Sequence, residues 1–155
     1  MKIQMNLEDQ FMRVAENNDG PVVILCDRGL MDGSAYVDHY TWSTVLDEIG
    51  VNTIQMRDMR YHLVLHLMSA ANGAEEFYDF ATNESRYEDL HNARLVDKKL
   101  IDAWIGHTNF KIIDNNVSTF KVKIERCIKE VLRLVGLPTA TNFYKKYLLY
   151  NTTEA

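Results

Sequence analysis

Apolar residues alternate along the chain between helical spacing and short continuous runs. The first pattern is a stripe at helical spacing made up of Ile3, Leu7, Phe11, Val14 and Ala15. It predicts a helix over residues 3–17. The second pattern is the apolar run Val22–Cys26, which is typical of a strand buried on both faces of a parallel sheet. Residues 27–40 hold glycines and short polar side chains, so we expect a loop there.

The same two patterns continue to residue 135. They predict, in chain order, a helix over 41–49, a strand over 61–67, a helix over 86–105, a strand over 110–114 and a helix from 118 or 119 to 135. Thr41 is a good N-cap for the first of these helices, and Gly50 is a good stop. The connection over 69–85 is long for a compact domain, which is typical of lids and binding loops.

Short apolar strands that alternate with amphipathic helices predict an α/β fold with a three-layer parallel sheet and flanking helices. Ligands of such sheets bind outside the carboxyl ends of the strands. Those ends are residues 27–29, 69–73 and 114–116, and all three are small and polar. We therefore expect the functional site at this edge of the sheet.

Composition and charge narrow the class of protein. The 155 residues amount to one domain, and a net charge of −5 without a block of like charges argues against a broad nucleic-acid or anionic-membrane surface. No apolar run approaches the ~20 residues of a membrane-spanning helix. The N-terminal residues lack the pattern of a signal peptide, so we expect a cytoplasmic protein.

Four residues invite a metal or disulfide interpretation. Cys26 and Cys127 stand in apolar contexts, and we expect both to be reduced and in the core. On a strand, His62 and His66 would lie about 13 Å apart, too far for one metal ion. Neither pair therefore predicts a site.

Several stretches together resemble a known family, the NadR/TRPL-translocation-defect type of P-loop AAA/kinase-like domain. The similarity is carried by "VVILCDRGLMDGSAYV", "RDMRYHLVLHLMSAANGAEEFY", the arginines around "ESRYEDLHNARLVDKKLIDAWIGH" and "FKIIDN". It covers about residues 5–138. The combination of these stretches is specific, whereas Asp-Arg-Gly alone would be a weak signal.

The resemblance implies a purine-nucleotide-binding domain, for ATP or GTP with Mg²⁺, acting as an NTPase or small-molecule kinase. It places Asp27 where the family handles Mg²⁺ through water, and Arg86 and Arg94 in a mobile lid that supplies arginines to the phosphates. These three would be the catalytic residues. The residues that contact the nucleotide would be Arg28, Asp32 and Asn115.

The sequence departs from the family in one respect: it contains no Gly-x-x-x-x-Gly-Lys-Ser/Thr. We therefore expect an N-terminally incomplete domain over 1–138, without its first strand and phosphate loop. Residues 139–155 would be a tail where a lost downstream module could begin. In the family's topology the missing strand would lie between 22–26 and 61–67, so their inner edges would be unpaired and open to a partner protein.

Each candidate residue also has a simpler structural interpretation. Asp27 and Arg28 would form a solvated charge pair, Asp32 would serve a turn, and Asn115 would cap a helix. Arg86 and Arg94 would pair with Glu88, Asp89 or Asp97 on one helix. Arg57, Asp58 and Arg60 precede a strand, on the side away from ligands, where structural pairing is expected.

Two functions therefore stay open from the sequence. One is a nucleotide-binding NTPase or kinase domain, impaired in these residues because the phosphate loop is absent. The other is a degenerate, non-catalytic assembly module that binds a partner protein through its unpaired edges.

Overall fold

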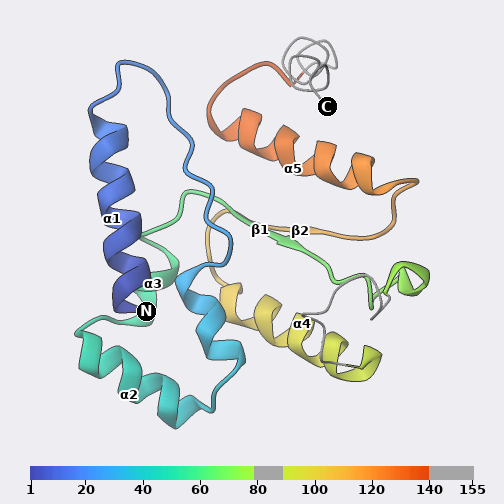
Figure 1. Ribbon diagram of the computed structural model, residues 1–155, viewed down its shortest axis with the longest axis horizontal. Helices are drawn as coiled ribbons and strands as arrows, with labels where there is room; N and C mark the ends of the chain where they lie inside the picture. Colours follow the sequence, from blue (N-terminus) through green and yellow to red (C-terminus); the bar gives the residue numbers. More distant parts are fainter. Residues whose placement is uncertain (79–88, 140–155) are drawn as a thin grey trace, which may run out of the picture. The chain divides into compact units, whose positions relative to one another are not determined.

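The computed structural model describes residues 1–78 and 89–139. In chain order the elements are α1 (Lys2–Glu16), η1 (Leu30–Ala35), α2 (His39–Ile49), α3 (Thr53–Arg57), β1 (Val64–Leu67), η2 (Glu75–Phe77), α4 (Leu90–Trp104), β2 (Phe110–Ile113) and α5 (Phe120–Leu134), as Figure 1 shows. Residues 1–116 form one compact unit, and a second begins at Val117 and contains α5. The first unit holds every described candidate site residue.

The long helices and two of the strands were predicted correctly. The structure confirms α1, α2, α4 and α5, and it confirms β1 and β2 in shorter form. Gly50 ends α2 with φ of 78°, the left-handed conformation that favours glycine. The cap of α2 was predicted wrongly, because Asp38 is the N-cap and Thr41 donates its N–H to it at 2.9 Å. Helix α3 was not predicted.

The sheet within the described residues consists of β1 and β2 alone. The two strands are parallel, and Val64 lies opposite Phe110 while Leu67 lies opposite Ile113. Helices together with a small parallel sheet agree with the α/β class. The three-layer sheet of the prediction is not confirmed.

The strand predicted over Val22–Cys26 is wrong for this structure. The segment runs without regular structure between α1 and η1, and no backbone hydrogen bond joins it to any described residue. Its side chains are largely exposed, Leu25 by 82%. A β-strand requires backbone hydrogen bonds to a neighbouring strand, and no described strand lies beside this segment to form them. Cys26 is exposed as a result, which corrects its assignment to the core.

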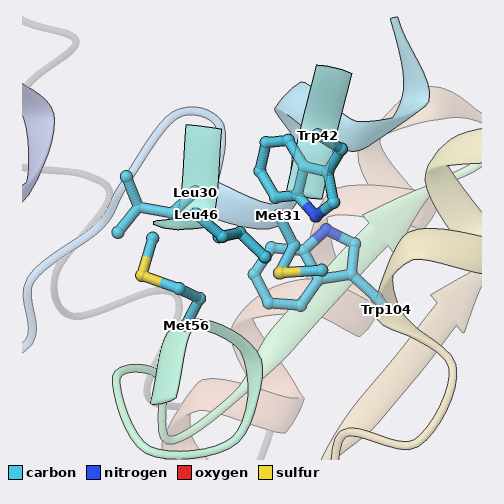
Figure 2. Packing of buried hydrophobic residues seen from close by; sticks show 6 residues of the cluster. All are labelled: Leu30, Met31, Trp42, Leu46, Met56 and Trp104. Carbon is cyan, nitrogen blue, oxygen red and sulfur yellow. The ribbon is translucent and has the colours of Figure 1, made fainter. Parts of the chain in front are cut away.

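The core lies instead around the segment expected to be a loop. It consists of Leu30 and Met31 from η1, Trp42 and Leu46 from α2, Met56 from α3, and Trp104 from α4, as Figure 2 shows. Leu30 and Met56 are each only 1% exposed. The part of the expected loop that forms η1 therefore supplies Leu30 and Met31 to the core instead of lying on the surface.

Helix α1 is attached to this core mainly through polar contacts. It contributes no buried residue, although Met1 and Met5 pack against the cluster. Arg60 pairs with Glu8 at 3.0 Å and with Asp9 at 2.7 Å. The structural pairing predicted for Arg60 is thus observed, and the apolar face of α1 is left open.

Candidate functional site

The turn Asp27-Arg28-Gly29 follows the unpaired segment and enters η1. Arg28 has φ of 75° and is the one non-glycine residue in the left-handed region among those described, a conformation that costs about 1–2 kcal/mol. Its carbonyl accepts a hydrogen bond from Gln4 Nε2 at 3.0 Å. Asp27 is exposed, and none of the described residues bonds to its carboxylate. The turn therefore holds Asp27 toward solvent.

Gly29 is required by its neighbour Trp104. A Cβ atom on Gly29 would lie 2.4 Å from Cζ2 and 2.8 Å from Cη2 of that indole. The ring is fixed, because Trp104 is 3% exposed and its Nε1–H donates to Asp32 Oδ1 at 2.5 Å. Packing against Trp104 thus explains the glycine of this motif without any ligand.

The carboxylate of Asp32 is engaged inside the protein. Besides the indole, it accepts the N–H of Gly29 at 3.3 Å on Oδ2, and Arg28 Nη1 lies 3.8 Å from the same oxygen. These contacts agree with the simpler interpretation of Asp32, in which its side chain stabilises a turn. A contact of Asp32 or Arg28 with a nucleotide stays a prediction.

A second hydrogen-bonded cluster lies at the carboxyl end of β1 and is centred on Asp97. This carboxylate is 5% exposed and accepts from His66 Nε2 at 3.0 Å, the N–H of Ser69 at 3.0 Å and Asn72 Nδ2 at 2.6 Å. Burial alone would raise the pKa of Asp97, but these donors outweigh burial and lower it below its ordinary value. The ionised side chain of Asp97 therefore links helix α4 to strand β1 and to the loop that follows β1.

The role of Asp97 was not predicted, although the sequence carried a signal for it. The buried residues of α4 are Ala93, Asp97, Leu100 and Trp104, which share one side of the helix. An acidic residue on an otherwise apolar stripe indicates a buried, satisfied carboxylate.

Asn115 holds the same loop from the other strand. Its Nδ2 donates to the carbonyl of Ser69 at 2.8 Å and to that of Asn72 at 2.7 Å. The cap of α5 is Thr119, which accepts from the N–H of Val122. The capping interpretation of Asn115 is therefore wrong, and its contact with a purine base stays a prediction.

Arg94 also belongs to this cluster. Its Nε donates to the carbonyl of Ala71 at 2.6 Å, and its Nη2 pairs with Glu75 at 2.7 Å. The ion-pair partner of Arg94 is thus Glu75, and neither Asp89 nor Asp97, two of the three partners expected in the structural interpretation; the third, Glu88, lies outside the described residues. Arg86, the other predicted lid arginine, lies outside the described residues. The structure therefore places Arg94, one of the two arginines predicted to lie in a lid, beside the loop at the carboxyl end of β1.

Helix α4 connects the two clusters. Asp97 and Trp104 are seven residues apart, about 10 Å along the helix. Trp104 fixes the turn that carries Asp27, and Asp97 fixes the loop that carries Ala71. A movement of α4 would therefore displace both candidate ligand-binding segments together.

A groove of about 480 Å³ lies between α1 and the segment that leads to Asp27. Its apolar lining comes from Leu7, Phe11 and Val14 of α1 and from Val22–Cys26, and Asp27 and Arg28 lie among its lining residues. Such a lining offers few hydrogen-bond donors for phosphates. The groove suits apolar side chains better than a triphosphate.

The residues present would supply only part of the donor set that a Mg²⁺-nucleotide requires. A nucleotide-bound Mg²⁺ needs one or two carboxylates besides phosphate oxygens, and Asp27 is an accessible one. Within the described residues no group of three or more His, Cys, Asp or Glu side chains is arranged to hold a metal ion alone. The sequence contains no Gly-x-x-x-x-Gly-Lys-Ser/Thr, the motif whose backbone N–H groups and lysine hold the phosphates in P-loop proteins. The donor set is thus incomplete, and no catalytic step follows from it.

No helix in the described part of the chain has the length and apolar character needed to cross a membrane.

Comparison with known proteins identifies the family. No curated protein and no solved structure matches the chain. A family model described as an AAA domain matches residues 1–120. The chain therefore belongs to this AAA domain family, a family of P-loop-type nucleotide-binding domains.

Proposed function

We propose that this chain is the purine-nucleotide-binding part of a cytoplasmic NTPase or small-molecule kinase of the NadR/TRPL-translocation-defect type. The observation that carries the proposal is the construction of the Asp27-Arg28-Gly29 turn. Gln4 holds the backbone of the turn and Trp104 packs against it, while Asp27 itself has no bond to the described residues. A fold that fixes a turn and leaves its acid exposed suits an acid that serves a ligand.

In this proposal the roles follow the chemistry of each side chain. Asp27 holds Mg²⁺ through water, and Arg28, whose side chain is 60% exposed, contacts a phosphate. Arg94 and Arg86 stabilise negative charge on the phosphates. Because Arg94 is paired with Glu75, its recruitment requires that this ion pair open.

The 155 residues alone should bind nucleotide poorly, because phosphate affinity rests on side-chain arginines without a cradle. Calorimetry with Mg-ATP and with Mg-GTP should show weak binding or none. Micromolar affinity of the unmodified chain would contradict the impairment. If an in-frame Gly-x-x-x-x-Gly-Lys-Ser/Thr is encoded upstream of Met1, the chain that carries it should bind, and Asp27→Asn should weaken its Mg²⁺-dependent affinity. Equal affinity of that variant would refute the role of Asp27.

The second candidate function is an assembly module that binds a protein. It is favoured by the open groove and the unpaired segment Val22–Cys26, whose five consecutive side chains are apolar. An unpaired backbone edge beside an apolar surface is the arrangement to which an extended chain adds as a strand. Amide exchange of residues 22–26 should be fast in the free chain and slow in a complex.

A further inference from the structure

The ion pair between Arg94 of α4 and Glu75 of η2 leaves part of the guanidinium unused. Arg94 Nε donates to the carbonyl of Ala71 at 2.6 Å, and Nη2 donates to Glu75 Oε1 at 2.7 Å. None of the described residues bonds to Nη1, and the side chain is 46% exposed. A guanidinium holds an oxyanion most firmly through two parallel N–H bonds. The edge formed by Nη1 and Nη2 is therefore engaged by one bond where it could make two.

The carboxylate of Glu75 lies where donors from the loop and from α4 converge. Its Oε1 accepts the N–H of Gly73 at 3.1 Å in addition to the bond from Arg94. Its own backbone N–H, the N–H of Gly73 and the Arg94 guanidinium together lower the pKa of Glu75, so this side chain is an anion at neutral pH. Backbone N–H groups and a guanidinium that meet at one oxyanion are also the donors with which proteins hold phosphate.

The loop after β1 does not need this ion pair to keep its place. Asp97 and Asn115 hold the residues that follow β1 through hydrogen bonds of 2.6 to 3.0 Å. The side chains of Arg94 and Glu75 are 46% and 44% exposed, and an ion pair with such exposure contributes little to stability. Glu75 can therefore leave Arg94 while the loop stays attached to α4.

We infer that Glu75 occupies the place of a phosphate group at Arg94, and that a polyphosphate ligand must displace this carboxylate to bind. This inference rests on the proposed function, which assigns Arg94 to the phosphates, and it adds regulation of that site by the chain itself. The pair lies beside the carboxyl end of β1, the edge at which ligands of parallel α/β sheets bind. The apparent affinity for the ligand is then reduced to the fraction of chains in which Arg94 is open.

The chemistry of the exchange favours a polyphosphate over the carboxylate. A phosphate group can engage Nη1 and Nη2 together, whereas Glu75 engages Nη2 alone. A phosphate group also carries more negative charge than a carboxylate, and a polyphosphate carries several such groups. The displaced carboxylate passes into water, since Glu75 is already 44% exposed. The exchange therefore leaves no buried charge without a partner.

Calorimetry of the full 155-residue chain with inorganic tripolyphosphate tests the competition. Glu75→Gln removes the competing charge and keeps the length of the side chain, so it should bind about two- to fivefold more tightly than the native chain. Glu76→Gln is the matched control, because Glu76 is exposed and bonds to no described residue. It removes the same charge without freeing Arg94, so its gain should be clearly smaller. Equal gains in the two variants would refute the inference.

Arg94→Gln shows whether the gain belongs to the guanidinium. In that background Glu75→Gln should no longer tighten the binding of tripolyphosphate, and a gain that persists would count against the exchange. Because Arg94→Gln also removes the bond to Ala71, NMR of the native chain provides a second measurement. The carboxyl carbon of Glu75 and Nε of Arg94 should shift along one saturation curve. A ligand that shifts Arg94 and leaves Glu75 unchanged binds without displacing the carboxylate, which contradicts the inference.

The outcomes separate this inference from the proposed function. If Arg94→Gln weakens binding but Glu75→Gln gains no more than Glu76→Gln, Arg94 is a phosphate site without an internal competitor, so the inference alone fails. If Glu75→Gln gains through Arg94 but Asp27→Asn leaves Mg²⁺-nucleotide affinity of the chain with a phosphate loop unchanged, the inference stands and the role of Asp27 fails. Absence of binding by Glu75→Gln, or a loss of thermal stability that Glu76→Gln does not share, overturns the inference.

Discussion

Gly29→Ala isolates the packing that builds the candidate site. The added methyl carbon would lie 2.4 Å from Cζ2 of Trp104, more than 1 Å inside van der Waals contact at about 3.5 Å. The indole cannot withdraw freely, because it donates to Asp32 at 2.5 Å and meets the ring of Tyr61 at a centroid distance of 5.3 Å. Overpacking of this kind costs 1–3 kcal/mol and occasionally more, so we expect about 3 kcal/mol.

Backbone strain adds nothing to this estimate, since Gly29 has φ of −99° and alanine adopts such a value readily. The whole loss is therefore steric. Urea and thermal unfolding followed by circular dichroism should show it, as a fall in melting temperature of roughly 6–12 °C for a chain of this size. Gly20→Ala is the control, because no atom lies within 4 Å of its added carbon. It should change stability by less than about 0.5 kcal/mol.

A double-mutant cycle assigns the loss to the indole. Trp104→Phe removes the atoms that the methyl group meets, so Gly29→Ala should cost less than about 1 kcal/mol in that background. An unchanged cost there would place the clash elsewhere. A cost below about 0.5 kcal/mol in the native background would refute the close contact itself.

Three further substitutions test the polar contacts. Asp97→Asn should cost about 3 kcal/mol in urea unfolding, because it leaves the donors of His66 and two neighbours without a charged acceptor. The pKa of Asp97 is lowered in the folded state, so its stabilisation is full above about pH 4 and is lost as pH falls further. The difference between the two proteins should shrink in that acid range. Tyr61→Phe should cost about 1–3 kcal/mol, because the N–H of Leu30 loses its partner at 2.9 Å. Arg60→Met should cost about 1 kcal/mol and speed amide exchange within α1 more than within α4.

The four long helices and the strands β1 and β2 could be predicted because their patterns are local. The stripe of α5 and the cap at Thr119 lie within one stretch of sequence, and so does the left-handed stop at Gly50. The apolar run Val22–Cys26 carried an equally clear local pattern and still failed. Strand formation depends on a neighbour in space, and a pattern in one segment does not report whether the neighbour exists.

The candidate site was predictable in part. Asp27 and Arg94 were singled out by the family resemblance, and their roles at a ligand stay predictions. The partners of these residues were not predicted, since Arg94 binds Ala71 and Glu75 across 19 to 23 positions of chain. The contact of Trp104 with Asp32 spans 72 positions. Pairings of this length depend on the packing of α4, which periodicity alone does not fix.

The Asp-Arg-Gly turn separates what the fold requires from what a ligand would require. Gly29 is explained by Trp104, and the left-handed Arg28 by the close return of its carbonyl to Gln4. Asp27 has no such internal reason, so the fold should tolerate Asp27→Ala with a change of less than about 0.5 kcal/mol. A stable Asp27→Ala protein beside a strongly destabilised Gly29→Ala protein would divide the motif into a packing part and a ligand part. A large loss of stability for Asp27→Ala would make the acid structural as well, and the motif would then carry no evidence for nucleotide binding.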